Sequence, residues 1–237
     1  NETIGVFLVN SFKTNNLNEE KMETLDSFAN LASTALYNAK IYSDLKNNYF
    51  NTAKALAKAI EAKDAYTKGH CDRVTELSVK AAKYMGFNDD QESIIKIAAI
   101  LHDIGKIGVP EKILNKPSTL TLKEYNIVKK HSTIGYEILS DIKHLKHERE
   151  ILYQHHERID GKGYPLGLFG ENILIEAKIL SLADAFDAMT SYRPYRKVMT
   201  PLEALDEINK NLGTQFDPYV GKLFMDMIKN EYVKTGS

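Results

Sequence analysis

The sequence has no tryptophan, a single cysteine and no long apolar run. One cysteine, Cys71, cannot build an internal disulfide framework, and such a low content predicts a protein of the reducing cytoplasm. The longest apolar runs, such as AAIL, fall far short of the roughly 20 residues that a membrane-spanning helix needs. No membrane segment is therefore expected in this part of the protein.

An excess of charge of either sign is also missing, since 31 Lys and Arg stand against 32 Asp and Glu. With no global positive field to hold a polyanion, binding of polymeric nucleic acid is not expected, and any phosphate must be recognised locally. The hydrophobic content of the chain is sufficient for a buried core. The 237 residues, 43% of them hydrophobic, suffice for one large globular domain or for one domain and part of another.

The first residues have the composition of a strand, and the rest of the chain is helical in pattern. Residues 4–10 (IGVFLVN) are β-branched and aromatic-rich and precede turn-forming Ser and Asn, which predicts one short strand. From Asn18, apolar residues recur at spacings of three and four over about 45 residues, which predicts a long helix. The predicted fold class is mainly α, a compact multi-helix bundle after a long N-terminal connector helix and a short β remnant.

The segment AAILHDIGKIG, residues 98–108, places a histidine and an aspartate at the end of an apolar run. The preceding apolar residues should face a core, so His102 and Asp103 are expected to be buried. A buried aspartate without a partner costs several kcal/mol or more. The pair therefore predicts a strong positive partner, such as a cation or a metal ion.

Other histidines and aspartates occur in similarly unusual places. His155 and His156 are consecutive, so on a helix their side chains diverge by about 100° and can share an ion only from opposite flanks of one helix edge or near a helix end. The glycine-rich segment DGKGYP follows closely, so a helix end is expected nearby. Asp184 lies on an otherwise small and apolar helical stripe. Each residue alone also has a plain structural explanation: His70 as a surface or capping residue, His131 as a helix-end histidine and Asp184 as an internal hydrogen-bonding group.

The whole set favours a metal centre over these separate explanations. Imidazole nitrogen and carboxylate oxygen together suit first-row transition metals. The candidate residues are His70, His102, Asp103, His131, His155, His156 and Asp184.

Three segments resemble the signature motifs of the HD-GYP family, HD phosphohydrolases that degrade cyclic dinucleotides: LHDIGKIGVPEKILNKP, HHERIDGKGYPLGL and ADAFDAMTSYRPYRK. The resemblance covers roughly residues 52–222, in the order of the family. IGVFLVN with LDSFANLASTALYNAKIYSDL resembles the last strand and exit helix of a GAF sensor domain. The expected organisation is a GAF-like remnant plus connector helix over residues 1–48 and an HD-GYP domain over residues 49–237. The missing initiator methionine suggests that the sequence begins inside a longer protein.

This resemblance implies a binuclear metal centre. It assigns one ion to His70, His102, Asp103 and Asp184, and a second ion, bridged by Asp103, to His131, His155 and His156. Some family members bind a third ion through a glutamate four residues before the first histidine. Tyr66 occupies that position here, and a phenol with a pKa near 10 is a poor ligand, so two ions are predicted. Glu61 and Asp64 lie close in sequence and leave a third site open.

Further residues are candidates for binding the substrate. Lys106 suits a non-bridging phosphate oxygen, with a solvated helix-end lysine as the alternative. In the GYP segment, Gly163 is expected to allow a backbone angle that other residues avoid, Pro165 to fix the next turn and Tyr164 to present its ring or hydroxyl. Arg193 and Arg196 flank a proline and could grip the second phosphate, unless one of them pairs with a carboxylate.

The resulting functional prediction is a phosphodiesterase that cleaves cyclic di-GMP to pGpG, with further cleavage to GMP left open. Attack of a metal-bridging hydroxide on phosphorus is the expected chemistry, with Asp103 and Lys106 as catalytic residues. Iron and manganese are favoured as the metals, and zinc and nickel are alternatives. Two other functions remain open, a catalytically silent cyclic-dinucleotide sensor or partner-docking module, and a di-iron oxygenase. The long helix also suggests a homodimer.

Overall fold

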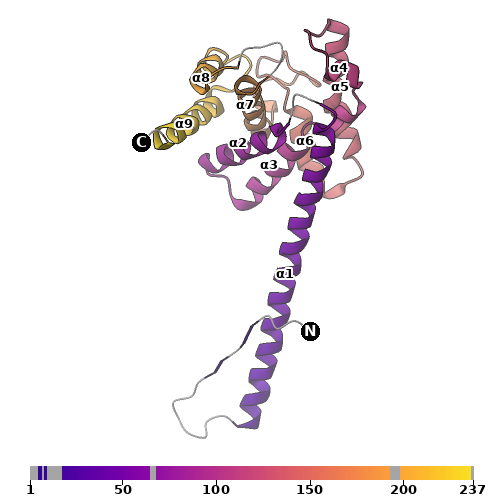
Figure 1. Ribbon diagram of the computed structural model, residues 1–237. Helices are drawn as coiled ribbons and strands as arrows, with labels where there is room; N and C mark the ends of the chain where they lie inside the picture. Colours follow the sequence, from indigo (N-terminus) through magenta and orange to yellow (C-terminus); the bar gives the residue numbers. More distant parts are fainter. Residues whose placement is uncertain (1–4, 7, 10–17, 65–67, 193–197, 236–237) are drawn as a thin grey trace. The chain divides into compact units, whose positions relative to one another are not determined.

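The computed structural model describes residues 5–6, 8–9, 18–64, 68–192 and 198–235 of the chain (Figure 1). The chain divides into two compact units, Asn1–Thr52 and Ala53–Ser237. Within the described ranges, none of the helices combines the length and the apolar character required to cross a bilayer.

The first unit contains most of helix α1 (Glu19–Glu61). Asn18 caps this helix, because its side chain accepts a hydrogen bond from the backbone N–H of Lys21 at 3.2 Å. Neither glycine nor proline occurs between residues 19 and 61, so nothing in the sequence interrupts the helix. The predicted long helix is confirmed.

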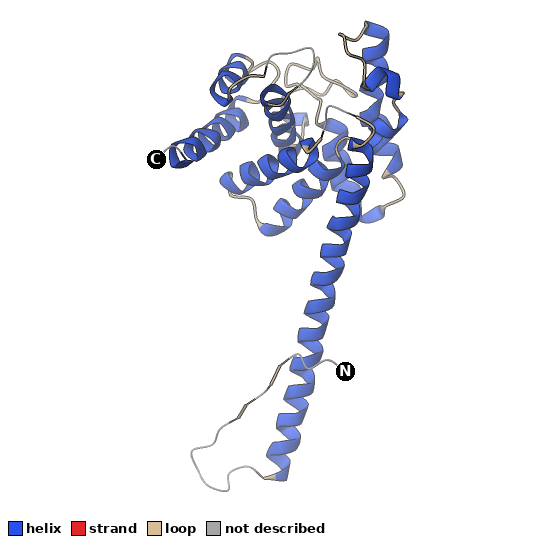
Figure 2. Ribbon diagram, in the orientation of Figure 1, coloured by secondary structure: helices blue, strands red, loops and turns tan. Residues whose placement is uncertain are grey.

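The predicted strand over residues 4–10 is not formed in the part that can be described. Gly5, Val6, Leu8 and Val9 lie in no strand, and Figure 2 draws no strand along the described chain. A strand is stable only when a neighbouring strand pairs with its backbone N–H and C=O groups, and the described residues supply no such neighbour. Composition alone therefore does not place these four residues in a strand.

The second unit is a helical bundle, as the periodicity predicts (Figure 2). After the end of α1 its helices are α2 (His70–Tyr84), α3 (Asp89–Leu101), η1 (Ile104–Gly108), α4 (Glu111–Leu114), α5 (Leu122–Ile138), η2 (Lys143–Leu145), α6 (Lys146–Gln154), η3 (Gly170–Asn172), α7 (Ile175–Thr190), α8 (Pro201–Lys210) and α9 (Pro218–Thr235).

Three of these helices begin with a capping box, in which two side chains satisfy backbone N–H groups that the first turn leaves unpaired. The cap residues are Asn88 for α3, Thr121 for α5 and Thr200 for α8. Each accepts from the third helical residue, whose Gln or Glu side chain accepts in return from the cap. These local signals place the start of α3, which ends just before His102, and the start of α5, which carries His131.

Helix α7 lies at the centre of the bundle and packs against α2, α3, α6, α8 and α9. It buries Ile179, Leu182 and Phe186 in the hydrophobic core. Because neighbours cover it on several sides, its apolar residues are not confined to one stripe. Asp184 and Asp187 of this helix therefore have apolar surroundings and need cationic or hydrogen-bonding partners there.

Candidate metal centre and substrate cavity

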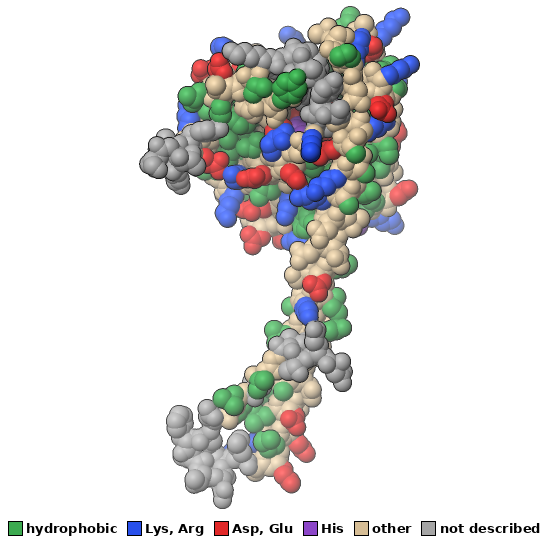
Figure 3. Space-filling model, in the orientation of Figure 1, with side chains coloured by type: hydrophobic (Ala, Val, Ile, Leu, Met, Phe, Trp, Pro, Cys, Tyr) green, Lys and Arg blue, Asp and Glu red, His purple; other side chains and the backbone are tan. Residues whose placement is uncertain are grey.

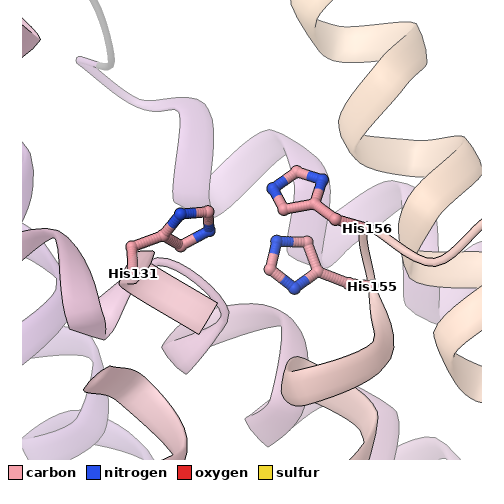
Figure 4. A group of neighbouring side chains, drawn as sticks. All are labelled: His131, His155 and His156. Atoms are coloured by element: carbon pink, nitrogen blue, oxygen red, sulfur yellow. The ribbon is translucent and has the colours of Figure 1, made fainter. Parts of the chain in front are cut away.

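The histidines and one aspartate singled out in the sequence form two groups of three in the structure. In each group the potential ligand atoms lie within 4.8 Å of one another. Figure 4 shows the second group, in which the ring of His131 from α5 faces the rings that follow α6. The first group is His70, His102 and Asp184, and the second is His131, His155 and His156.

Asp103 lies between the two groups. Its Oδ2 atom is 3.3 Å from Nε2 of His102 and 3.8 Å from Nε2 of His70. Its Oδ1 atom is 3.6 Å from Nε2 of His131. One carboxylate oxygen therefore faces each group, which is the arrangement that a carboxylate bridging two ions requires.

Gly105 explains how this aspartate comes so close to helix α5. A Cβ atom at this position would overlap the carbonyl oxygen of His131 and lie 2.5 Å from the amide nitrogen of Gly135. Only a glycine lets the backbone of η1 pack directly on the backbone of α5. The glycine of the HDIGK segment thus fixes the distance between Asp103 and the second group.

Three of the histidines share one way of orienting the ring. Nδ1 of His102, His131 and His155 lies 2.7, 2.7 and 2.5 Å from the backbone carbonyl oxygen three residues earlier. Each ring thus donates its Nδ1–H to its own helix, which leaves Nε2 as the basic nitrogen. In all three, Nε2 is buried without a hydrogen-bond partner. Buried acceptors of this kind are costly unless something binds them, so the donor set fits metal ions.

His70 is oriented in another way because it is the first residue of α2. Its Nδ1 lies 2.7 Å from Oδ2 of Asp187, a carboxylate that is 3% exposed. Arg73 pairs with the same carboxylate and donates to the hydroxyl of Ser191 at 3.0 Å. Burial opposes protonation of His70, but Asp184 and Asp187 outweigh it and raise its pKa to about 9.

The protonation of the second group suits metal binding. Burial lowers the pKa of His131 and His156, and it lowers the pKa of His155 to about 3. All three rings are therefore neutral at physiological pH. Neutral imidazole is the form that binds a metal ion.

Both aspartates of the centre are held in the ionised form. Burial opposes ionisation of Asp103, but the charge of Lys106 and the nearby His102 outweigh it and hold the pKa well below its usual range. Burial also opposes ionisation of Asp184, yet its hydrogen bond with His70 lowers its pKa. Ionised carboxylates can bind divalent ions without first releasing a proton.

Lys106 lies beside the bridging position. Its ammonium is 2.8 Å from Oδ2 of Asp103 and 3.2 Å from Oδ2 of Asp64. Burial alone would lower the pKa of Lys106, but Asp103 and Asp64 raise it, so the side chain stays charged. A fixed positive charge is thereby placed next to the candidate ligands.

The possible ligands for a third ion have other roles. Glu61 accepts hydrogen bonds from the backbone N–H groups of Gly69 at 3.3 Å and Cys71 at 2.7 Å, and so supports the start of α2. Asp64 pairs with Lys106. Tyr66, on which the two-ion prediction rests, lies outside the described residues.

The GYP segment is anchored by Glu157, which was not among the residues predicted from the sequence. Glu157 is 3% exposed, and its carboxylate accepts backbone N–H groups from Leu166, Gly167 and Leu168 at 2.6, 3.1 and 2.9 Å. Three donors directed at one buried carboxylate hold the segment against the end of α6. In the sequence, the feature that could have identified Glu157 is its position directly after His155 and His156.

Gly163 is needed for a different reason from the one predicted. It is absent from the glycines with positive φ, so an unusual backbone angle is not its role. A Cβ atom here would lie 2.5 Å from Cα of Glu157 and 2.7 Å from its carbonyl carbon. The glycine therefore permits close contact between two backbone segments. The Tyr164–Pro165 bond that follows is cis, and the Tyr164 ring stacks on His156 at a centroid distance of 4.7 Å.

A cavity of about 410 Å³ opens over the two groups. In the face shown in Figure 3, little histidine surface is visible, in keeping with the burial of these rings. Arg193 and Arg196 lie outside the described residues. The lining includes His70, Asp103, Lys106, Tyr125, Lys129, His131, His156, Arg158, Lys162, Gly163, Tyr164, Asp184 and Gln215.

Comparison with known proteins agrees with this geometry. The chain is 42% identical over 169 residues to the "Cyclic di-GMP phosphodiesterase response regulator RpfG" of Xanthomonas campestris pv. campestris, a match that covers 70% of this chain and 45% of that protein. It is 36% identical over 183 residues to "3'3'-cGAMP-specific phosphodiesterase 3" of Vibrio cholerae, with coverage of 76% and 40%. The chain thus spans less than half of either relative.

The fold has a counterpart among solved structures. Bd1817, an HDG"Y"P protein from Bdellovibrio bacteriovorus, aligns with a TM-score of 0.59 at 23% identity, over 78% of this chain and 62% of that one. These matches confirm the resemblance to the HD-GYP family, whereas the GAF-like assignment of the first residues stays a prediction. The family model described as "HD domain" matches residues 54–220. The chain therefore belongs to the HD domain family.

Proposed function

We propose that this chain is a metal-dependent phosphodiesterase that hydrolyses a cyclic dinucleotide. The observation that carries the proposal is the position of Asp103, with one carboxylate oxygen toward each of two groups of metal-binding side chains. The cavity above it has space for a substrate larger than a single phosphate, about 410 Å³. The names of the relatives, which are phosphodiesterases of cyclic di-GMP and cGAMP, point to the same class of substrate.

The centre is proposed to hold two divalent ions, with iron or manganese favoured over zinc and nickel. A bound pair of such ions supplies Lewis acidity and a deprotonated water as the nucleophile at neutral pH. His70, His102 and Asp184 would hold one ion, and His131, His155 and His156 the other. Asp103 would join them, because a carboxylate has two oxygens that can reach two ions at once.

Lys106 is proposed to stabilise the charge that develops on the cleaved phosphate. Its ammonium lies 2.8 Å from Asp103, so it is adjacent to the place where phosphorus must sit. A compact, permanently charged donor suits a non-bridging phosphate oxygen. Because Asp103 and Asp64 hold this side chain in place, little reorganisation is needed when the substrate binds.

The substrate is proposed to be cyclic di-GMP, cleaved to pGpG, with cleavage onward to GMP as a second step to be tested. Gly163 and Tyr164 line the cavity wall beside the second group, and Pro165, the next residue of the GYP segment, is proposed to help position them. Arg193 and Arg196 are proposed as further contacts with the substrate phosphates. One observation argues against each rival function. A di-iron oxygenase would have no need of the cations that line the cavity. A silent sensor would have no need of a full set of metal ligands.

The test combines metal loading with product analysis. The chain is loaded anaerobically with Fe(II) or Mn(II) and given cyclic di-GMP, 3'3'-cGAMP or cyclic di-AMP, and the products are separated by liquid chromatography. Linear dinucleotides are the expected products, and Asp103→Asn should abolish them. His144→Ala, an exposed histidine outside both groups, is the matched control and should keep full activity. Tight binding without turnover would instead support the sensor, and consumption of dioxygen would support the oxygenase.

Residues 1–48 are proposed to belong to a preceding regulatory region, and α1 to pair with a second copy. Large apolar side chains of α1 are exposed in the single chain, among them Phe28, Leu31 and Leu45 at 59%, 68% and 66%. Burial of such side chains in a coiled coil is a common means of dimerisation. Sedimentation velocity should show a dimer that Leu31→Glu converts to a monomer. The cytoplasmic location stays a prediction.

A further inference from the structure

Lys129 is a cation of the cavity wall that neither the motifs nor the proposed metal centre uses. It lies on α5 two residues before His131 and is half-buried. Its ammonium lies 4.7 Å from the centroid of the Tyr125 ring and 5.1 Å from the centroid of the Tyr164 ring. Two aromatic rings thus restrict the position of a side chain that would otherwise be flexible.

The charges of the cavity and their burial together single out this residue. Lys106 is paired with Asp103 and Asp64, and Arg158 with Asp160, so their charges are largely balanced by the protein. Lys162 also lines the cavity, but its side chain is exposed, whereas that of Lys129 is half-buried. No carboxylate within the described ranges pairs with Lys129. The faces of aromatic rings attract an ammonium without cancelling its charge. Lys129 is therefore held in place and still able to bind an anion from the cavity.

The position of Lys129 is close to the centre but separate from it. The Tyr164 ring, which lies next to the ammonium, also stacks on His156 of the second group, with centroids 4.7 Å apart and planes 32° apart. One aromatic ring therefore stands between Lys129 and a candidate metal ligand. An anion at Lys129 would be a near neighbour of the reacting phosphate, not the reacting phosphate itself.

We propose that Lys129, held by Tyr125 and Tyr164, binds the phosphate of the substrate that is not cleaved. This inference rests on the proposed function, since a cyclic dinucleotide carries two phosphates and only one of them reacts at a time. Lys129 then determines specificity: it strengthens binding of substrates with a second phosphate and contributes nothing to the hydrolysis of a single phosphodiester. Tyr125 is 43% exposed, so the subsite opens toward solvent, where the rest of the macrocycle can extend.

The test compares two substrates and two neighbouring lysines. Lys129→Met removes the charge and keeps an unbranched side chain, and Lys130→Met is the matched control because Lys130 is exposed on the same helix and does not line the cavity. Hydrolysis of cyclic di-GMP is measured beside hydrolysis of bis(4-nitrophenyl) phosphate, which has one phosphate, and metal content is measured for each variant.

For Lys129→Met, KM for cyclic di-GMP should rise about tenfold or more, the loss expected when one hydrogen bond to a charged group is removed. Its kcat/KM for bis(4-nitrophenyl) phosphate and its metal content should stay as in the wild type, and Lys129→Arg should restore KM. Equilibrium binding of cyclic di-GMP should weaken by the same factor. Lys130→Met should leave the kinetic constants for both substrates unchanged.

Two results would overturn the inference while leaving the proposed function intact. One is an unchanged KM and affinity for cyclic di-GMP in Lys129→Met, and the other is an equal loss on both substrates, which would mean a structural effect. Failure of the proposed function looks different, because the wild-type chain itself would then neither hydrolyse nor bind a cyclic dinucleotide. In that event the proposed phosphate subsite at Lys129 is rejected together with the proposed function.

Discussion

Replacing Gly105 with alanine should disrupt the centre without changing any of its candidate ligands. The added Cβ would overlap the carbonyl oxygen of His131 and approach the amide of Gly135 to 2.5 Å, against an ordinary contact of about 3.5–4.0 Å. Both obstacles are backbone atoms, so η1 and α5 must separate by roughly an ångström or more. Asp103 and Lys106 then move away from the second group.

The expected cost follows from this geometry. Overpacking a tight contact costs about 1–3 kcal/mol, and rigid backbone on both sides puts Gly105→Ala at the upper end or above it. A loss of about 3 kcal/mol lowers Tm by roughly 6–12 °C for a domain of this size. A displacement of about 1 Å at a catalytic centre can reduce turnover about 100-fold. The activity should therefore fall far more than the folded fraction at 25 °C.

The assay measures Tm, metal content and phosphodiesterase activity for Gly105→Ala and for Gly108→Ala in the same short helix. A Cβ at Gly108 would meet Cδ1 of Ile134 at 2.7 Å, the far end of a flexible side chain that can turn away. Gly108→Ala should therefore be close to the wild type. If Gly105→Ala kept the wild-type Tm, metal content and activity, the contact between η1 and α5 would not set the geometry of the centre.

Two further substitutions test the residues that support the centre. Asp187→Ala should weaken metal binding about 10- to 100-fold in a chelator competition, because His70 loses the carboxylate that orients its ring; an unchanged metal affinity would remove Asp187 from this role. Glu157→Ala should lower the free energy of unfolding by about 3 kcal/mol or more, since three backbone N–H groups lose their acceptor at roughly 1 kcal/mol or more each. Urea denaturation measures that loss, and a change below the error of the fit would contradict the anchoring role.

The sequence was most informative where spacing and chemistry coincide. The long helix could be predicted because its apolar period runs without glycine or proline. His102 and Asp103 could be singled out because charge at the end of an apolar run demands a partner. His155 and His156 could be expected near a helix end, and α6 does end at Gln154.

The parts that could not be predicted depend on contacts between distant segments. Asp187 orients His70 across 117 positions of sequence, and no local pattern separates it from an ordinary helical aspartate. Gly163 was expected to supply an unusual backbone angle, whereas its role is to let two backbone segments touch. Lys129 could not be distinguished from Lys130 until α5 was packed against the GYP segment. The strand predicted over residues 4–10 is not formed at the described positions Gly5, Val6, Leu8 and Val9, because composition cannot supply a pairing partner.

Two metal ions are expected to bind on either side of Asp103, and anomalous diffraction from crystals of the metal-loaded chain can locate both of them. Two anomalous peaks about 3.5–4 Å apart are expected, one at His70, His102 and Asp184 and one at the three histidines of the second group, with one Asp103 oxygen bound to each. A single peak, or two peaks with neither ion in contact with Asp103, would contradict this expectation.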